Sequence, residues 1–377
     1  MKSENKEKII ALRHLLHQNA ELSNHETHTM QLLKQFIREN TTASIVEKDG
    51  WFYAWRPGRT GEKNLAFRAD MDAVAVDETV CLPYASQTAG VSHKCGHDGH
   101  MAALAGLILE TEGAVFDPNL FFLFQPAEET GEGGSRCADF VPECRIDEIY
   151  AYHNIPGFPE GTVLLASGTC ACASRGLILK FEGATSHAAY PQYGHNPAYA
   201  IAEVIRQLPS AADPSSYSGL ILCTIIQVNV GEPAFGVSAG YGELLLTIRA
   251  EKEEELDRLQ DRILDACEAA CRKDSLAFSY EIRDAFPETR NHPACVAKIQ
   301  AACEAQNIPF SYPEEPFRWS EDFGYFLKQT SGAFFGVGDG EGHPQLHTEV
   351  YDFNDRILET VVSVFFGILC QNRESRK

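Results

Sequence analysis

The order of local patterns between residues 174 and 284 constrains the fold of this 377-residue chain more than any other feature. Apolar alternation is typical of strands, and apolar spacing of three and four residues is typical of helices. The patterns predict a strand, a helix, two strands, a helix and a strand, at Gly176–Phe181, Pro197–Leu208, Leu220–Val230, Glu243–Ala250, Glu253–Lys273 and Ala277–Arg283. This order forms a self-contained split β-α-β-β-α-β unit. Within it, the Ser-, Pro- and Asp-rich segment Pro209–Gly219 is expected to be a flexible connection.

The sequence on either side of this unit belongs to a second domain. Strands alternate with helices up to about residue 165, and motifs that carry metal-binding side chains resume after residue 284. A chain of 377 residues is also too long for one core of ordinary size. We therefore predict a discontinuous domain of residues 1–173 and 285–377, with residues 174–284 inserted into it.

Composition argues against several classes of partner. The net charge of −21 disfavours nucleic acid and anionic membranes. No apolar run is long enough to span a bilayer, and Arg13, His14 and His17 interrupt the apolar core that a signal peptide would need. The twelve cysteines are scattered and are expected to be mostly buried thiols in a reducing compartment. We expect a cytoplasmic enzyme.

The segment from His93 to His100 reads His-Lys-Cys-Gly-His-Asp-Gly-His, and an apolar helical pattern begins at its end. Thiol and imidazole groups are ligands of zinc-like metals, and glycine allows the turn that would bring Cys95 and His97 to one ion. The alternative is that these histidines satisfy a core or a helix cap. Asp98 is expected to cap the helix. For His93 two positions are possible: near a bound metal or on the surface.

Further metal-binding side chains follow predicted strands. The strands are residues 119–125, 148–152 and 332–337, and the side chains at or beyond their ends are Glu128, Glu129, His153, His343 and His347. Open α/β sheets keep their chemistry at the carboxyl ends of strands. A solvated loop is the alternative for each residue taken singly, but the recurrence predicts one shared site.

Seven motifs along nearly the whole chain resemble one family. They are the segment Leu16–Leu22 with Glu26 and Thr29, Arg68–Ala73, His93–His100, Glu128–Glu129, Ser186–Ala189, Ser320–Phe323 and Leu346–Thr348. In this order they resemble the metal-dependent amidohydrolases of the M20 peptidase clan. The subfamily is the one that holds hippurate hydrolases, auxin-amide hydrolases and N-acetyldiaminopimelate deacetylases.

The resemblance implies roles for particular residues. It implies two divalent metal ions (zinc, manganese, cobalt or nickel) with ligands at Cys95, His97, Glu129, His153 and His347. It also implies that Glu128 is the catalytic base. Two such ions can activate a water near neutral pH, and an adjacent glutamate can pass the proton of that water to the leaving nitrogen. Asp70 is expected to orient a ligand histidine.

The resemblance gives His187, in the inserted domain, the role of stabilising the oxyanion of the substrate carbonyl. The resemblance does not extend to the family's other substrate contacts, because Gly236–Gly240 stands where many relatives carry Asn-Val-Ile-Pro-Asp. The substrate specificity of the family is therefore not assigned to this chain. Asn196, Asn229 and Arg249 are weaker candidates for binding a substrate carboxylate, and a sheet-edge ion pair is the alternative for Arg249.

Together these patterns predict an α/β protein. We expect a mixed-sheet dinuclear metallohydrolase domain with an inserted ferredoxin-like α+β domain, acting as a homodimer or higher homo-oligomer. The expected reaction is cleavage of the amide bond of N-acyl amino acids or related small amides. One alternative is a dipeptidase or carboxypeptidase of the same clan. Another is a catalytically silent, metal-bound dimeric binding protein, which the presence of Glu128 and all five ligands disfavours.

Overall fold

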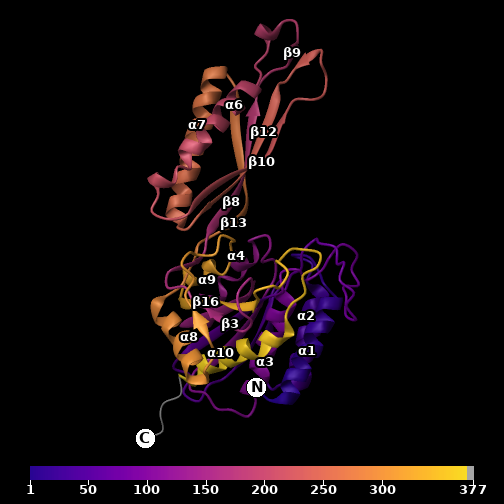
Figure 1. The fold of residues 1–377 in the computed structure, drawn as a ribbon, viewed down its shortest axis with the longest axis vertical. Helices are drawn as coiled ribbons and strands as arrows, with labels where there is room; N and C mark the ends of the chain where they lie inside the picture. Colours follow the sequence, from indigo (N-terminus) through magenta and orange to yellow (C-terminus); the bar gives the residue numbers. More distant parts are fainter. Residues whose placement is uncertain (372–377) are drawn as a thin grey trace. The chain divides into compact units, whose positions relative to one another are not determined.

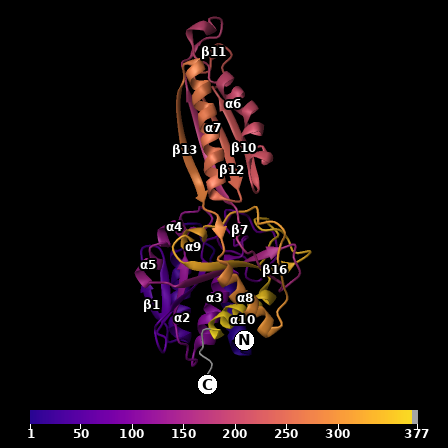
Figure 2. The same ribbon diagram turned by 90° about the vertical axis from the view of Figure 1, so that its left-hand side faces the viewer.

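A computed structural model describes residues 1–371 of the chain (Figures 1 and 2). Its contacts divide the chain into two compact units. The larger unit contains Met1–Cys170, Thr289–Glu315 and the chain from Asp322 onward, and the smaller contains Ala171–Glu288 and Pro316–Glu321. No helix in the described part combines the length and the apolar character needed to cross a membrane.

The larger unit is built on a mixed eight-stranded sheet in the order β1-β2-β4-β3-β5-β16-β6-β15. The four central strands, β4, β3, β5 and β16, run parallel to their neighbours in this group. Their carboxyl ends therefore meet at one edge of the sheet. The strands are β1 (Ser44–Glu47), β2 (Phe52–Arg56), β3 (Asn64–Asp70), β4 (Asn119–Gln125), β5 (Glu148–Pro156), β6 (Val163–Leu164), β15 (Phe310–Ser311) and β16 (Ser331–Gly340).

Five longer helices pack around the main core of this unit. They are α1 (Ser3–Gln18), α2 (Thr27–Asn40), α3 (His97–Thr111), α8 (Pro293–Gln306) and α10 (Leu358–Cys370). Helix α3 is buried along nearly its whole length, as expected of a helix that is apolar on all sides. Phe67, Phe122 and Phe365 join strands β3 and β4 and helix α10 in this core. The first residue of α3, His97, is consequently held in a packed environment.

Short elements complete the larger unit. They are α4 (Gly133–Cys137), α5 (Phe140–Cys144), α9 (Gly324–Leu327), β14 (Thr289–Arg290) and the 3-10 turn η3 (Asp355–Ile357), and β7 (Thr169–Ala171) pairs with β14. Phe140 of α5 packs against Tyr53 and Phe121. Phe121 faces α5 and its neighbour Phe122 lies in the main core, because successive residues of a strand point to opposite faces of the sheet.

The smaller unit has an antiparallel sheet in the order β10-β12-β8-β13. Helices α6 and α7 share one core with alternate residues of β8 and β12, among them Leu177, Leu179, Leu244 and Leu246. The elements are β8 (Ala173–Glu182), β9 (Ser186–His187), η1 (Pro191–Tyr193), α6 (Ala198–Ala211), η2 (Pro214–Ser216), β10 (Ile221–Val230), β11 (Val237–Ser238), β12 (Tyr241–Ala250), α7 (Glu253–Asp274) and β13 (Ala277–Phe286). The main elements follow the predicted order.

Three local predictions were wrong. Strand β5 runs on to Pro156, so His153 lies within the strand and not at its end. Helix α3 begins at His97, three residues before the predicted apolar pattern. Helix α6 contains Pro209 and ends at Ala211, so the first part of the predicted flexible connection is helical. Pro209 lacks the amide hydrogen for one hydrogen bond of the last turn, and buried Leu208 and Ala211 keep this turn packed.

Candidate metal centre and active site

The five predicted metal ligands lie together in the larger unit. Ligand atoms of Cys95, His97 and His153 are all within 4.8 Å of one another, and so are those of Cys95, Glu129 and His347. Cys95 Sγ is 3.4 Å from His153 Nε2, and His347 Nε2 is 3.4 Å from Glu129 Oε1. Their elements are the start of α3, strand β5 and the loops that follow β4 and β16.

Glycine 96 allows the turn between Cys95 and helix α3. Its φ of 95° lies in the left-handed region that favours glycine. A Cβ atom at this position would also lie 2.5 Å from Oδ1 of Asn154. That oxygen is hydrogen-bonded to His100 Nε2 at 2.6 Å. Gly96 is therefore required both by the turn and by the close approach of strand β5.

Glu128 and Glu129 follow a second unusual backbone position. Ala127 has a φ of 52°, which is uncommon for a residue with a side chain. Its amide donates to Glu26 Oε1 at 2.7 Å. His97 Nε2 lies 3.9 Å from Glu128 Oε2 and 3.7 Å from Glu129 Oε1. Both carboxylates of the pair therefore approach the same imidazole.

Asp72, which sequence reasoning did not single out, orients His97. The Nδ1 atom of His97 lies 2.9 Å from the Asp72 carbonyl oxygen and 3.2 Å from its Oδ1. The other carboxylate oxygen of Asp72 accepts from the Glu129 amide at 2.9 Å and from Ser23 at 2.7 Å. Asp72 thus fixes two candidate ligands at once. Its place two residues after Asp70, just beyond β3, was the available signal.

Asp70 has different partners from those expected. It is fully buried, accepts from Arg68 at 2.7 Å and lies 2.6 Å from His100 Nδ1. Its contact with His97 Nε2 is longer, at 3.8 Å. Asp70 therefore hydrogen-bonds His100, which is not a predicted ligand, and faces the same space as the ligand atoms. Asp322 of the Ser320–Phe323 motif continues this network to Arg68 at 2.8 Å.

The electrostatics of this space favour a bound cation. Burial opposes protonation of His97, but the charges of Asp70 and Asp72 and the hydrogen bond to Asp72 outweigh it and raise its pKa to about 10. Burial, with Glu129, Glu128 and Asp70 nearby, raises the pKa of the Cys95 thiol well above its ordinary value. Both groups would therefore keep a proton that a metal ion displaces on binding.

Two buried atoms at this place have no hydrogen-bond partner among the described residues: His97 Nε2 and Glu129 Oε1. Buried polar atoms are nearly always hydrogen-bonded or bound to an ion. Burial and the neighbouring His100 and His97 lower the pKa of His153 well below its ordinary value, which leaves a neutral imidazole of the kind that binds metals. The donor set of thiol, imidazole and carboxylate therefore fits zinc-like divalent ions.

His187 belongs to the smaller unit. It is exposed, on strand β9, and pairs with Val237 of β11. Its Nδ1 accepts from the Ala189 amide at 3.0 Å, so in the neutral ring the proton is on Nε2. Asn196 donates to Ser238 at 3.2 Å. Arg249 forms hydrogen bonds with the Arg318 carbonyl and, at 2.8 Å, with Ser320 Oγ.

One expectation for the segment His93–His100 was wrong. Asp98 is not the N-cap of α3, because Gly96 holds that position and Asp98 lies inside the helix. Its Oδ1 accepts from the Gly99 amide at 2.9 Å, and its Oδ2 lies 2.9 Å from Arg13 Nε and 2.8 Å from His17 Nδ1. For His93, which the sequence left open between a place near the metal and the surface, the structure gives a buried side chain.

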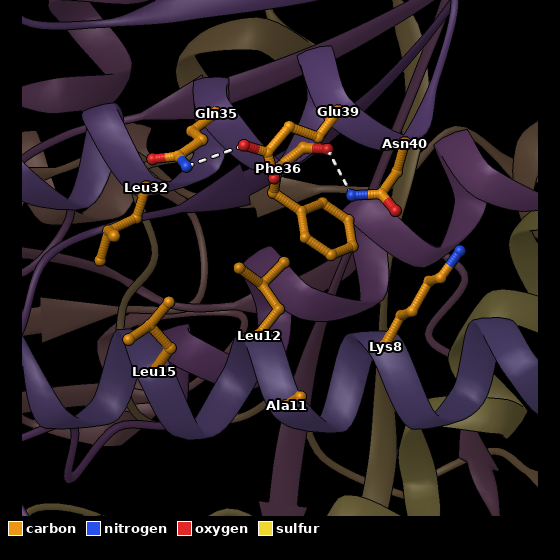
Figure 3. A pocket seen from close by; sticks show the side chains of 9 residues that line it. All are labelled: Lys8, Ala11, Leu12, Leu15, Leu32, Gln35, Phe36, Glu39 and Asn40. Atoms are coloured by element: carbon orange, nitrogen blue, oxygen red, sulfur yellow. Dashed lines mark hydrogen bonds between the residues drawn. The ribbon is translucent and has the colours of Figure 1, made fainter.

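A separate groove lies between α1 and α2, with a volume of about 310 Å³ (Figure 3). Leu12, Leu15 and Phe36 form its apolar wall, and Lys8 and Asn40 lie at one end (Figure 3). None of its lining residues is a candidate metal ligand.

The family model for peptidase family M20/M25/M40 matches residues 66–371. This segment holds all five candidate metal ligands and both glutamates of the pair. The chain therefore belongs to peptidase family M20/M25/M40 and is a hydrolase of carbon–nitrogen bonds.

Relatives extend the match to nearly the full chain. The N-acetyldiaminopimelate deacetylase of Bacillus subtilis (strain 168) is 30% identical over 375 residues, covering 96% of this chain and 97% of the relative. The N-acetyldiaminopimelate deacetylase of Limosilactobacillus reuteri (strain DSM 20016) is 29% identical over 376 residues, with coverage of 96% and 97%.

Solved structures share the fold. One is the Bacillus subtilis YXEP protein, described as a dinuclear metal binding peptidase from the M20 family, with a TM-score of 0.85, 21% identity and 98% of each chain covered. Another is the aminopeptidase PepT of Bacillus cereus ATCC 10987, with a TM-score of 0.75, 14% identity and coverage of 97% and 98%. At these identities the likeness concerns the fold alone.

Proposed function

We propose that this protein is a metal-dependent amidohydrolase that cleaves the amide bond of N-acyl amino acids. The observation that carries the proposal is the cluster of Cys95, His97, Glu129, His153 and His347 with Glu128 beside it. The relatives named as N-acetyldiaminopimelate deacetylases support an N-acyl amino acid as the substrate class. A dipeptidase of the same family is the competing function.

In this proposal the cluster holds two divalent ions. When bound, such ions polarise the substrate carbonyl and lower the pKa of water toward neutrality. Glu128 takes the proton of the attacking water and delivers it to the leaving amide nitrogen. Asp72 holds the His97 ring and the Glu129 backbone, so the ligands need little rearrangement. Asp70 acts on the site through His100 and through its own charge.

His187 is proposed to donate its Nε2 proton to the carbonyl oxygen as negative charge develops there. The Ala189 amide supports this role, because it occupies Nδ1 and leaves the donor at Nε2. His187 can act only if the smaller unit of the same subunit reaches the larger one, or if a second subunit supplies it. We propose that residues 174–284 form this lid and dimerisation domain on a catalytic domain of residues 1–173 and 285–377.

We further propose a cytoplasmic homodimer. All twelve cysteines are free thiols, which suits a reducing compartment. Strand β10 is an edge strand of the smaller unit and exposes Ile225, Ile226 and Val228. An exposed apolar edge readily pairs with another strand, and a second copy of the chain is the proposed partner. Sedimentation of the purified protein would measure its oligomeric state.

The test of the activity is a matrix of substrates and metals. Purified protein, stripped of metal and reloaded with zinc, manganese, cobalt or nickel, is assayed on N-acetyl amino acids, N-benzoyl amino acids and dipeptides. We expect hydrolysis of the N-acyl amino acids to be fastest. Faster turnover of dipeptides would favour the competing function, and no turnover of any amide by the fully metallated protein would reject both.

A further inference from the structure

Lys94 is a buried cation beside a candidate metal ligand. Its side chain is 0% exposed, and the next residue is Cys95. The ammonium group donates to Glu78 Oε1 and, at 2.7 Å, to the carbonyl oxygen of Tyr351. A buried charge is costly unless it is paired and hydrogen-bonded. These two contacts therefore fix where the side chain of Lys94 lies.

The backbone of Lys94 holds the same loop at a second point. Its carbonyl oxygen accepts from the His347 amide at 2.8 Å. His347 has a φ of 60°, and its side chain is 50% exposed. A left-handed backbone at a residue with a side chain persists only where the surroundings impose it. Lys94 thus ties both ends of the turn from His347 to Tyr351.

The partner of the ammonium group is itself anchored. Glu78 Oε1 lies 2.9 Å from His17 Nε2, and Glu78 Oε2 accepts from the Ser86 amide at 2.9 Å. His17 belongs to helix α1 and is completely buried. The contacts of Lys94 therefore connect the loop of His347 to the packed body of the larger unit.

We propose that Lys94 is a positioning residue, which sets His347 relative to Cys95 so that both side chains bind one metal ion. The inference rests on the proposed function, because it requires a metal at this cluster. The ligand atoms of Cys95, Glu129 and His347 lie within 4.8 Å of one another. Lys94 precedes Cys95 in the chain, and its carbonyl oxygen accepts from the His347 amide. Loss of its ammonium group would leave the Tyr351 carbonyl without this donor and the turn with one contact to Lys94 instead of two.

The test measures metal binding rather than activity. Zinc affinity and stoichiometry are determined by equilibrium dialysis with elemental analysis for the wild type, Lys94→Met, His347→Ala and the double variant. Lys298→Met is the matched control, since Lys298 pairs with Glu148 at the start of strand β5, away from His153. We expect Lys94→Met to weaken one of two ions by about 10- to 100-fold, and Lys298→Met to bind both as the wild type does.

The double variant separates positioning from a general structural effect. If Lys94 acts through His347, the double variant binds zinc no more weakly than His347→Ala alone. Wild-type affinity of Lys94→Met for both ions, or additive losses in the double variant, would overturn the inference. If Lys94→Met does not fold, Glu78→Gln decides: selective weakening of the same ion supports the inference and unchanged binding overturns it. A wild-type protein that binds no metal would instead reject the proposed function.

Discussion

The two units place their candidate catalytic residues in opposite surroundings. In the larger unit, Asp70, Asp72 and His97 are completely buried and hydrogen-bonded. In the smaller unit, His187 is exposed on the two-residue strand β9. Buried polar networks define one arrangement, whereas exposed short segments open and move at low cost. The comparison indicates that packing positions the metal-binding residues, whereas the position of His187 depends on a short exposed strand.

Removal of metal should have the largest effect, because the buried site loses the ions that polarise the substrate. Chelation is expected to abolish hydrolysis, and readdition of the ion should restore it. Cys95→Ser should weaken metal binding at least about tenfold, while Cys303→Ser, at a buried thiol of α8, serves as control. Full activity of protein shown by elemental analysis to be metal-free would refute the buried metal site.

Glu128→Gln should have the second-largest effect. The substitution keeps the shape of the side chain and removes the base, so kcat should fall by roughly 10²- to 10⁴-fold with metal content unchanged. Turnover and metal content are measured on the same sample. Loss of metal from this variant would mean that Glu128 is a ligand and that the roles of Glu128 and Glu129 are exchanged.

His187→Ala tests the role of the exposed histidine in the smaller unit. Loss of one oxyanion donor should lower kcat by about 10²- to 10³-fold, with metal content and oligomeric state unchanged. His195→Ala is the control, since His195 is also an exposed histidine of the smaller unit. Wild-type turnover of His187→Ala would reject the role.

Subunit exchange shows which subunit supplies His187. Inactive Glu128→Gln and His187→Ala proteins are mixed, and exchange is verified separately. Recovered activity means that the histidine acts across a subunit interface. No recovery despite exchange rejects that geometry.

Asp72→Asn should have the smallest effect of the four. The amide can still contact His97 but loses the charge that fixes the imidazole, so metal affinity should fall by about 10- to 100-fold. Asp117→Asn is the control, because Asp117 pairs with Arg59 at the surface. Equilibrium dialysis measures both variants. Unchanged affinity of Asp72→Asn would show that the Asp72 carbonyl oxygen and packing are enough to orient His97.

The residue pattern was sufficient to predict the α/β class and the order of elements in the smaller unit, because apolar periodicity follows secondary structure directly. The set of five ligands came from the family resemblance, since the strand-end pattern also included His343, which contacts the Asp352 carbonyl oxygen and is in none of the ligand groups. The contacts of Asp72 and Lys94 could not be predicted, since their partners become neighbours only on folding: His97 and Glu129 for Asp72, and Tyr351 and Glu78 for Lys94.

The errors have the same origin. Asp98 was expected to cap a helix because local sequence favours short-range hydrogen bonds. One oxygen of its carboxylate does accept from the Gly99 amide, but the other contacts Arg13 and His17 of helix α1. His153 was expected at a strand end, but β5 is paired with β16 along its whole length and continues to Pro156. In both cases the outcome depended on packing between segments far apart in the sequence, which a local pattern does not contain.

The place of β16 in the sheet has a consequence for synthesis of the chain. This strand, Ser331–Gly340, lies between β5 and β6, which precede it by more than a third of the chain. The main elements of the smaller unit are contiguous in sequence and can fold as soon as they leave the ribosome. The larger unit can close its sheet only after Gly340 has been made, and His347 is made later still. Metal capture by the full set of proposed ligands therefore has to follow synthesis of the smaller unit.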